Sequence, residues 1–153
     1  MQLRVLIGSD HGGYSLKGEL IKFLTELGHE VLDFGTHSND PVDYPDIACL
    51  VATQVAKDPT TVGIIIDGAG TGSAITANKV PGIRAAACYD TFTAKNSREH
   101  NNANVLTLGS RNTGIEVVKD IVKAWLSTTF AGARHNRRFE KLLQVERRFL
   151  RDA

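Results

Sequence analysis

Short apolar runs alternate with longer segments of helical spacing along the whole chain. The third run is the most uniformly apolar, which is typical of a central parallel strand buried on both faces. A polar or glycine-rich segment closes each run, as expected at strand ends. The pattern predicts five strands, in the segments LRVLIGS (3–9), HEVLDFG (29–35), VGIIIDG (62–68), IRAAACY (83–89) and NVLTLGS (104–110).

Segments between and after these strands have apolar residues three or four positions apart, which predicts helices. The segment 14–28 has five such positions and ends at a glycine. In the segment 113–130 we expect Val117 to face inward on the same side as Ile121 and Trp125. A last helix is predicted from about His135 to Arg151, after the sheet is already complete.

This order of elements predicts an α/β fold of the Rossmann-like, three-layer type. A five-stranded parallel sheet would carry helices on both faces, with an extra C-terminal helix. We find no repeat, linker or low-complexity segment, so the chain is predicted to be one domain over residues 1–153. The apolar stripe of the last helix could pack on its own domain or bury itself against a second subunit.

Composition removes several classes of function. The 153 residues carry a formal net charge of +1, which gives no electrostatic basis for binding nucleic acid or an anionic membrane. No apolar run approaches the roughly 18 residues of a membrane span, and the first residues are typical of a strand rather than a signal peptide. Cys49 and Cys88 lack metal-type spacing, and we expect both to be reduced core residues of a cytoplasmic protein.

Chemically active side chains follow the predicted strands and the adjoining helices. Ligands of open parallel sheets bind beyond the carboxyl ends of the strands, so we expect these side chains to gather at that one edge. Such a set suits a small, polar, anionic molecule. The residues are Asp10, His11, Tyr44, Asp67, His100, Asn101, Arg111, Arg134, His135 and Arg138.

Three glycines at alternating positions follow Asp67, namely Gly68, Gly70 and Gly72. Closely spaced glycines allow backbone N–H groups to point into one space and hold an anion. The spacing is not that of a dinucleotide fingerprint, and the lysine of a P-loop is absent. A tight strand-to-helix turn without a ligand is therefore the alternative interpretation.

Several other residues have structural alternatives as well. Asp10 could cap the first helix, and Tyr44 could pack in its loop. His100 could interact with the dipole of a helix C-terminus without taking part in chemistry. Arg134 and Arg138 could form a solvated helical face or grip a phosphate with charge-assisted hydrogen bonds.

Taken together, the motifs resemble those of B-type ribose-5-phosphate isomerases, in the superfamily that includes galactose-6-phosphate isomerase subunits. The resemblance implies Rossmann-like homodimers or tetramers with active sites shared between subunits. It implies a phosphorylated sugar as substrate and no metal or cofactor. The residues that carry it are GSDHGG (8–13), DYPD (43–46), GAGTG (68–72), SREHNNANVLTLGSR (97–111) and GARHNRR (132–138).

The resemblance also implies a role for each matching residue. His100 would assist the opening of the sugar ring, Asp10 would stand at the entrance for the sugar, and Asp67 would occupy the place of the proton-transfer base. These three would be the catalytic residues. His100 and Asn101 would come from the neighbouring subunit. The substrate-binding set would be His11, Tyr44, Gly68, Ala69, Gly70, Gly72, Ser73, Asn101, Arg111, Arg134, His135 and Arg138.

Asp67 departs from the family pattern. Many members carry a cysteine at this position, and others use a glutamate where this chain has Ser73. Asp67 could itself move the proton between two carbons, or it could bind a substrate hydroxyl or the loop amides.

We therefore expect an aldose–ketose isomerase that converts ribose 5-phosphate to ribulose 5-phosphate through an enediolate. The alternatives are an isomerase of galactose 6-phosphate or a tetrose phosphate, and a non-catalytic subunit that binds sugar phosphates.

Overall fold

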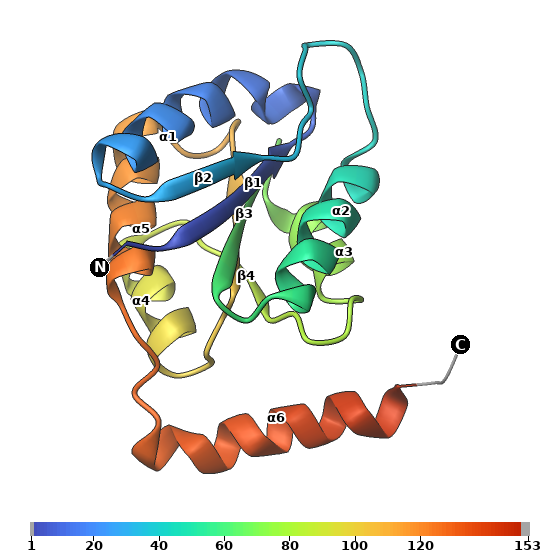
Figure 1. Cartoon of the computed structure of the whole chain (residues 1–153), viewed down its shortest axis with the longest axis vertical. Coiled ribbons are helices and arrows are strands. Elements are labelled where there is room, and N and C mark those ends of the chain that lie inside the picture. The colour runs from blue at the N-terminus through green and yellow to red at the C-terminus, as the bar shows by residue number, and fades with distance from the viewer. Residues whose placement is uncertain (1, 151–153) are drawn as a thin grey trace.

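Five parallel strands form the central sheet of the computed structural model, which describes residues 2–150 (Figure 1). Their order across the sheet is β2-β1-β3-β5-β4, and every neighbouring pair is parallel. This confirms the predicted α/β class and the number of strands. The strands are β1 (Arg4–Ser9), β2 (Glu30–Asp33), β3 (Thr61–Asp67), β4 (Ala85–Ala87) and β5 (Val105–Gly109).

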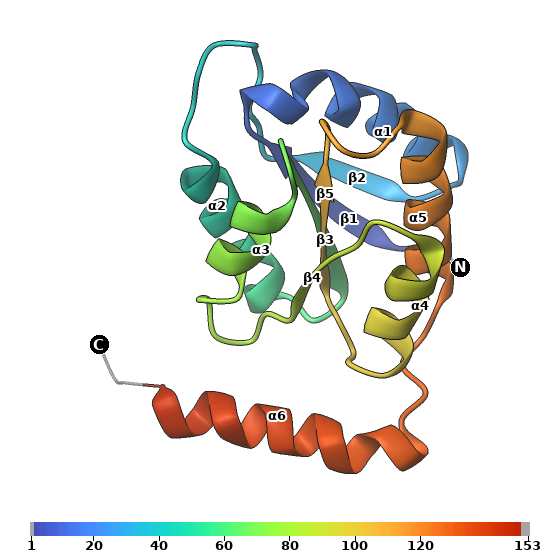
Figure 2. The same cartoon turned by 180° about the vertical axis from the view of Figure 1, so that it is seen from behind.

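Helices cover both faces of the sheet and complete the three layers (Figure 2). One face packs against α1 (Tyr14–Glu26), α4 (Thr91–Glu99) and α5 (Ile115–Ser127). The other packs against α2 (Tyr44–Lys57) and α3 (Thr71–Ala77). The remaining elements are two 3₁₀ turns, η1 (His11–Gly13) and η2 (Ala133–His135), and the C-terminal helix α6 (Asn136–Phe149).

Strand β3 lies at the centre and separates two hydrophobic cores. Ile64 and Ile66 face the core under α1 and α5, while Ile65 faces the core under α2. This alternation follows from the pleat of a strand, in which successive side chains point to opposite faces. The chain leaves β1 toward β2 on one side and later enters β3 on the other. The carboxyl ends of β1 and β3 therefore flank the crevice where open α/β sheets bind ligands.

Two predictions about individual core residues are wrong. Val117 is 47 % exposed, and Val118 is buried instead. The buried stripe of α5 runs from Val118 through Ile121 to Trp125, at spacings of three and four residues that keep to one helical face. Cys49 is exposed on α2, whereas Cys88 is buried as expected, and neither forms a disulfide.

Helix α6 lies beyond the amino ends of the strands and stands apart from the three layers (Figure 1). It ends at Phe149, so the predicted end at Arg151 falls outside the described residues. Among its contacts with the rest of the chain, the Glu146 carboxylate accepts a hydrogen bond from Gly82 N–H at 2.9 Å. The Arg84 guanidinium also lies over the Phe139 ring at 5.1 Å. No helix within residues 2–150 has the length and apolar composition to cross a membrane.

Candidate active site

Asp67 is the last residue of β3 and is buried, with 5 % of its surface exposed. The chain turns sharply after it, and Gly70 adopts a positive φ of 82° that favours glycine. The turn brings the start of α3 back to the Asp67 carboxylate. Oδ1 accepts a hydrogen bond from Gly70 N–H, and Oδ2 accepts from Ser73 N–H at 2.9 Å and Ser73 Oγ–H at 2.8 Å.

These bonds show that Asp67 binds the loop amides, which is one of the arrangements expected from the sequence. They also change the expected anion site, because the N–H groups of Gly70 and Ser73 already have an acceptor. A carboxylate has about four lone-pair sites and uses three of them here, so Oδ1 keeps one that can accept a proton.

Asp10 and His11 stand beside this turn because β1 is the neighbour of β3. Asp10 N–H donates to the carbonyl of Ile66 at 3.2 Å, and the Asp10 carboxylate caps η1 by accepting from Gly13 N–H at 3.2 Å. The structural alternative for Asp10 is thus present in the fold. His11 Nδ1 accepts a hydrogen bond from Val42 N–H at 3.2 Å. In the neutral ring this leaves the Nε2–H of His11 free to donate.

Tyr44 and Arg111 complete this part of the site. A Cβ atom added at Gly72 would lie 2.5 Å from the Tyr44 ring, so the tyrosine rests directly on the glycine turn. Arg111 N–H donates to the carbonyl of Gly68 at 3.0 Å, and its side chain lies over the same glycine. We call the resulting set the carboxyl-edge group, which consists of Asp10, His11, Tyr44, residues 67–73 and Arg111.

The remaining predicted residues lie near the amino ends of the strands, at the opposite edge of the sheet. The expectation that all of the site residues gather at one edge is therefore wrong. Helix α4 is capped by Asp90 beyond the carboxyl end of β4 and runs back to its C-cap at His100. A helix of nine residues spans about 13 Å, which carries His100 and Asn101 to the start of β5. Ala131 N–H donates to the carbonyl of Glu99 at 3.1 Å, which brings η2 to the same place. The amino-edge group consists of His100, Asn101, Arg134, His135 and Arg138.

Within the amino-edge group the two histidine rings stack, with centroids 3.9 Å apart. Arg134 Nε–H donates to His135 Nε2 at 3.3 Å, and His100 Nδ1 lies 3.3 Å from the amide nitrogen of Asn96. Potential metal-ligand atoms of Glu99, His100 and His135 lie within 4.8 Å of one another. Arg134 would have to leave Nε2 before a cation could bind there, so the geometry fits a hydrogen-bonded cluster better than a metal site.

His135 should make the protein less stable in acid. Burial, together with His100 and Arg134, lowers the pKa of His135 below its ordinary value, while Glu99 acts in the opposite direction. The unfolded chain then binds this proton first, at about pH 6.5, so the free energy of unfolding falls as the pH drops through the lower folded pKa. Urea unfolding at about pH 7.5 and pH 5.5 should show a smaller difference for His135→Gln than for the wild type.

His29 provides a comparison for this measurement. Burial, followed by the N-terminal charge, also lowers the pKa of His29, which directly precedes β2, three strands away from β5 in the sheet. His29→Gln should therefore remove its own share of the pH dependence, and the two effects should add. An unchanged pH dependence in His135→Gln would contradict the prediction.

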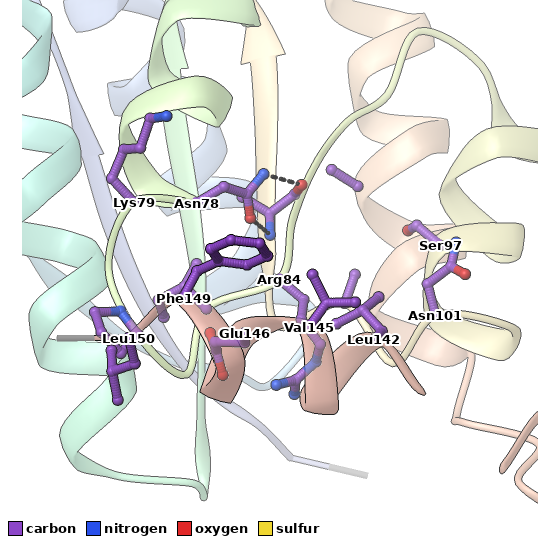
Figure 3. A pocket seen from close by; sticks show the side chains of 15 residues that line it. Asn78, Lys79, Arg84, Ser97, Asn101, Leu142, Val145, Glu146, Phe149 and Leu150 are labelled. Atoms are coloured by element: carbon purple, nitrogen blue, oxygen red, sulfur yellow. Dashed lines mark hydrogen bonds between the residues drawn. The ribbon is translucent and has the colours of Figure 1, made fainter. Parts of the chain in front are cut away.

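A groove of about 930 Å³ lies between α6 and the amino ends of the strands (Figure 3). Ile83, Ala86 and Ala103 line it together with Leu142, Val145 and Phe149 of α6. Asn101 of the amino-edge group also lines it. These α6 side chains remain at least 42 % exposed, so the apolar stripe of α6 is not buried within the chain.

Lys17 was missed by the sequence analysis. Its side chain is buried, and its ammonium group binds Asp33 Oδ1 at 2.6 Å and the carbonyl of Thr36 at 2.5 Å. These bonds hold α1 against the end of β2 and the loop that connects β2 to α2. A signal was available, because Lys17 stands three residues before Leu20 and seven before Leu24, on the core-facing stripe of α1.

The fold is that of an open α/β protein, and the carboxyl-edge group places polar side chains at the β1/β3 switch point, where proteins of this class bind ligands. The sequence profile of the Ribose/Galactose Isomerase family matches residues 5–142. The chain is 45 % identical over 145 residues to ribose-5-phosphate isomerase B of Escherichia coli, covering 95 % of this chain and 97 % of that protein. The chain therefore belongs to the Ribose/Galactose Isomerase family.

Solved structures give the same result. Ribose-5-phosphate isomerase B of Clostridium thermocellum superposes with a TM-score of 0.93 at 49 % identity, over 97 % of this chain and 100 % of that one. The Mycoplasma genitalium enzyme with bound ribulose-5-phosphate superposes with a TM-score of 0.91 at 39 % identity, over 95 % and 97 %. The resemblance seen in the motifs and the Rossmann-like fold are both confirmed.

Proposed function

We propose that this protein is an aldose–ketose isomerase that converts ribose 5-phosphate to ribulose 5-phosphate. The similarity to B-type isomerases over almost the whole chain supports this, as does a relative of known structure that holds the ketose product. The observation that carries the mechanism is the buried Asp67 carboxylate at the end of the central strand, beside the β1/β3 switch point.

The reaction requires a base next to the substrate carbonyl and donors for the enediolate. Asp67 removes the proton from carbon 2, next to the aldehyde, and returns it to carbon 1, while the proton of the carbon 2 hydroxyl passes to the carbon 1 oxygen. The lone-pair site that remains on Oδ1 receives that proton. Because Gly70 and Ser73 donate to Asp67, they orient the base, and the enediolate is held by other N–H groups of the turn at Gly68, Ala69 and Gly72.

We infer that the active site is shared between two copies of the chain. In one chain the carboxyl-edge and amino-edge groups lie at opposite ends of the sheet, and α4 separates them. A second copy that brings its amino-edge group to the first copy's carboxyl edge completes the site. His100 then opens the sugar ring with Asn101 beside it. Asp10, His11 and Tyr44 contact the sugar, and Arg111, Arg134, His135 and Arg138 bind the phosphate.

The groove under α6 supports this assembly. A homodimer would fill its 930 Å³ with apolar side chains of the second copy and bury Leu142, Val145 and Phe149. Burying a large apolar side chain contributes roughly 1.5 to 3 kcal/mol, so the exposed stripe is a strong reason for association. Asn101 lines the same groove, which places the interface next to the amino-edge group. The two free thiols suit a cytoplasmic protein.

The proposal is tested by measuring ketose formation from ribose 5-phosphate, with galactose 6-phosphate and erythrose 4-phosphate assayed in parallel. We expect turnover of ribose 5-phosphate. Turnover of another sugar alone would make Asp67 part of a change in specificity. Thermal stabilisation by sugar phosphates without any turnover would instead identify a non-catalytic binding subunit.

A further inference from the structure

Three side chains hold the carbonyl groups of the turn that follows Asp67. The carbonyl oxygen of Ala69 accepts hydrogen bonds from Tyr89 Oη–H at 2.8 Å and from Asn112 Nδ2–H at 3.2 Å. The carbonyl oxygen of Gly70 accepts from Thr107 Oγ–H at 2.6 Å. These donors come from the segment between β4 and α4, from within β5, and from the loop after β5, so three separate parts of the chain converge on two peptide groups.

Thr107 is a polar residue inside the hydrophobic core. It lies fully buried in β5 between Leu106 and Leu108, where an apolar residue would pack as well. A buried hydroxyl needs a hydrogen-bond partner to offset its loss of water. Thr107 finds this partner in the carbonyl of Gly70, and this bond spans 37 positions of the sequence. The hydroxyl thus ties the central strands to the turn.

The approach of the β5 loop to the turn is equally close. A Cβ atom at Gly109 would lie 2.8 Å from the carbonyl oxygen of Ala69 and would overlap Oδ1 of Asn112. Glycine at this position therefore allows Asn112 to reach the turn. Burial, followed by the nearby Asp67 carboxylate, raises the pKa of the Tyr89 phenol, so that Tyr89 keeps the proton that it donates to Ala69.

These bonds fix the direction of the donor that holds Asp67. The carbonyl and the N–H of a trans peptide point in opposite directions, and the Ala69–Gly70 peptide is trans. Tyr89 and Asn112 hold its carbonyl on one side, and the Gly70 N–H on the other side donates to Asp67. Rotation of this peptide would break all three bonds and would leave the carboxylate held only by Ser73, so the fixed position of Oδ1 depends on the two side chains.

We propose that Tyr89, Thr107 and Asn112 are positioning residues that act through the peptide groups of residues 69–71 to hold the Asp67 carboxylate in place for proton transfer. The inference rests on the proposed function, in which Asp67 is the base. Thr107 is buried behind the turn and acts through the backbone. None of these three residues is an expected phosphate ligand. Removing one of them should therefore affect the chemical step and not the binding of the phosphate.

Thr107→Val tests the proposal, because it deletes the hydroxyl and keeps the shape of the side chain. A displacement of about 1 Å at a reacting group can slow a reaction roughly 100-fold, so we expect kcat to fall about 10- to 100-fold with KM nearly unchanged. Ribose 5-phosphate deuterated at carbon 2 should show a larger isotope effect on kcat in the variant. Thr107→Ser, which keeps the hydroxyl, should restore most of the rate.

Thr61→Val is the matched control. Thr61 is also a buried threonine in a strand, and its hydroxyl donates to the backbone carbonyl of Asp58 at 2.7 Å, at the opposite edge of the sheet. Thr61→Val should lower thermal stability by about as much as Thr107→Val does and should leave kcat unchanged. Equal kcat values for Thr107→Val and the wild type, or equal losses in the two valine variants, would overturn the proposal.

Two further measurements keep the test decisive. Tyr89→Phe is the second test if Thr107→Val does not fold. It removes one donor at the rim of the site and should also lower kcat while KM stays constant. Hydrogen exchange of the Gly70 amide can be measured without substrate, and it should become faster in Thr107→Val and in Tyr89→Phe. If the wild type turns over none of the sugars, the proposed function fails. Unchanged exchange at Gly70 would then still overturn the positioning role by itself.

Discussion

Asp67→Asn should reduce kcat for ribose 5-phosphate by at least about 100-fold, because it removes the group that accepts the proton. General-base catalysis by a positioned side chain typically contributes on the order of 10² to 10⁴ in rate. Asparagine is almost the same size as aspartate, and its carbonyl oxygen can still accept from Ser73. The amide has no site that can take a proton from carbon at neutral pH. Steady-state kinetics on the purified variant measure the loss.

Two further variants distinguish the role of Asp67 as a base from its role as the acceptor of hydrogen bonds from the loop. Asp67→Cys replaces the carboxylate with the ionisable group that many family members carry at this position, and it should recover much of the lost rate. Ser73→Ala removes one donor at 2.8 Å from Asp67 but leaves the base in place, so its effect should be much smaller. Inorganic phosphate should raise the melting temperature of all three variants, which would show that the site is still formed.

The alternative is that Asp67 serves only to hold the turn. Its three hydrogen bonds to Gly70 and Ser73 would then be its whole function. In that case Asp67→Asn would keep near-normal turnover and lose thermal stability, because one orientation of the amide places its NH₂ group against the Gly70 N–H. Near-normal turnover would therefore contradict the assignment of Asp67 as the base.

The sequence predicted the sheet well because buried parallel strands have a strong signal. Strand β3 is apolar without interruption, and the glycine and polar segments mark its ends. The order β2-β1-β3-β5-β4 could not be predicted, because it depends on which helix covers which face. Which individual residues are buried in the core was harder to predict. Val117 and Val118 are neighbours of equal hydrophobicity, and only packing against the sheet decides which of them is buried.

The site was predicted in part for a similar reason. Residues at the end of a strand or directly after it, such as Asp67 and Asp10, were placed at the correct edge because the strand itself carries them there. His100 was placed wrongly because a crossover helix runs antiparallel to the strands and ends at the opposite edge. The loop amides were among the expected partners of Asp67, but the hydroxyl of Ser73 was not, since Ser73 meets the carboxylate only through the closed turn. Thr107 gave no signal, because a threonine is ordinary in a strand.

The separation of the two groups leads to a second prediction with a large effect. Asp67→Asn and His100→Asn should each be nearly inactive alone, and mixed dimers of the two chains should recover activity. In a mixed dimer one site combines both defects, while the other combines the intact carboxyl-edge group of one chain with the intact amino-edge group of the other. Random pairing of a two-fold symmetric dimer gives half mixed dimers, each with one good site of two, so about one quarter of the wild-type rate should return.

Co-expression of the two chains with different affinity tags isolates the mixed dimers, which should then have about half of the wild-type rate. Asp67→Asn paired with Asp10→Asn is the matched control. Both of these residues lie in the carboxyl-edge group, so every site of that mixed dimer keeps one defect and its rate should not exceed the average rate of the two single variants. Recovery in the control, or none in mixed dimers of Asp67→Asn and His100→Asn, would contradict sharing. A site shared across two edges would also explain why one chain leaves Asn101 and the apolar stripe of α6 around an open groove. On this proposal both features would meet the second copy, and we expect association and catalysis to depend on the same surface.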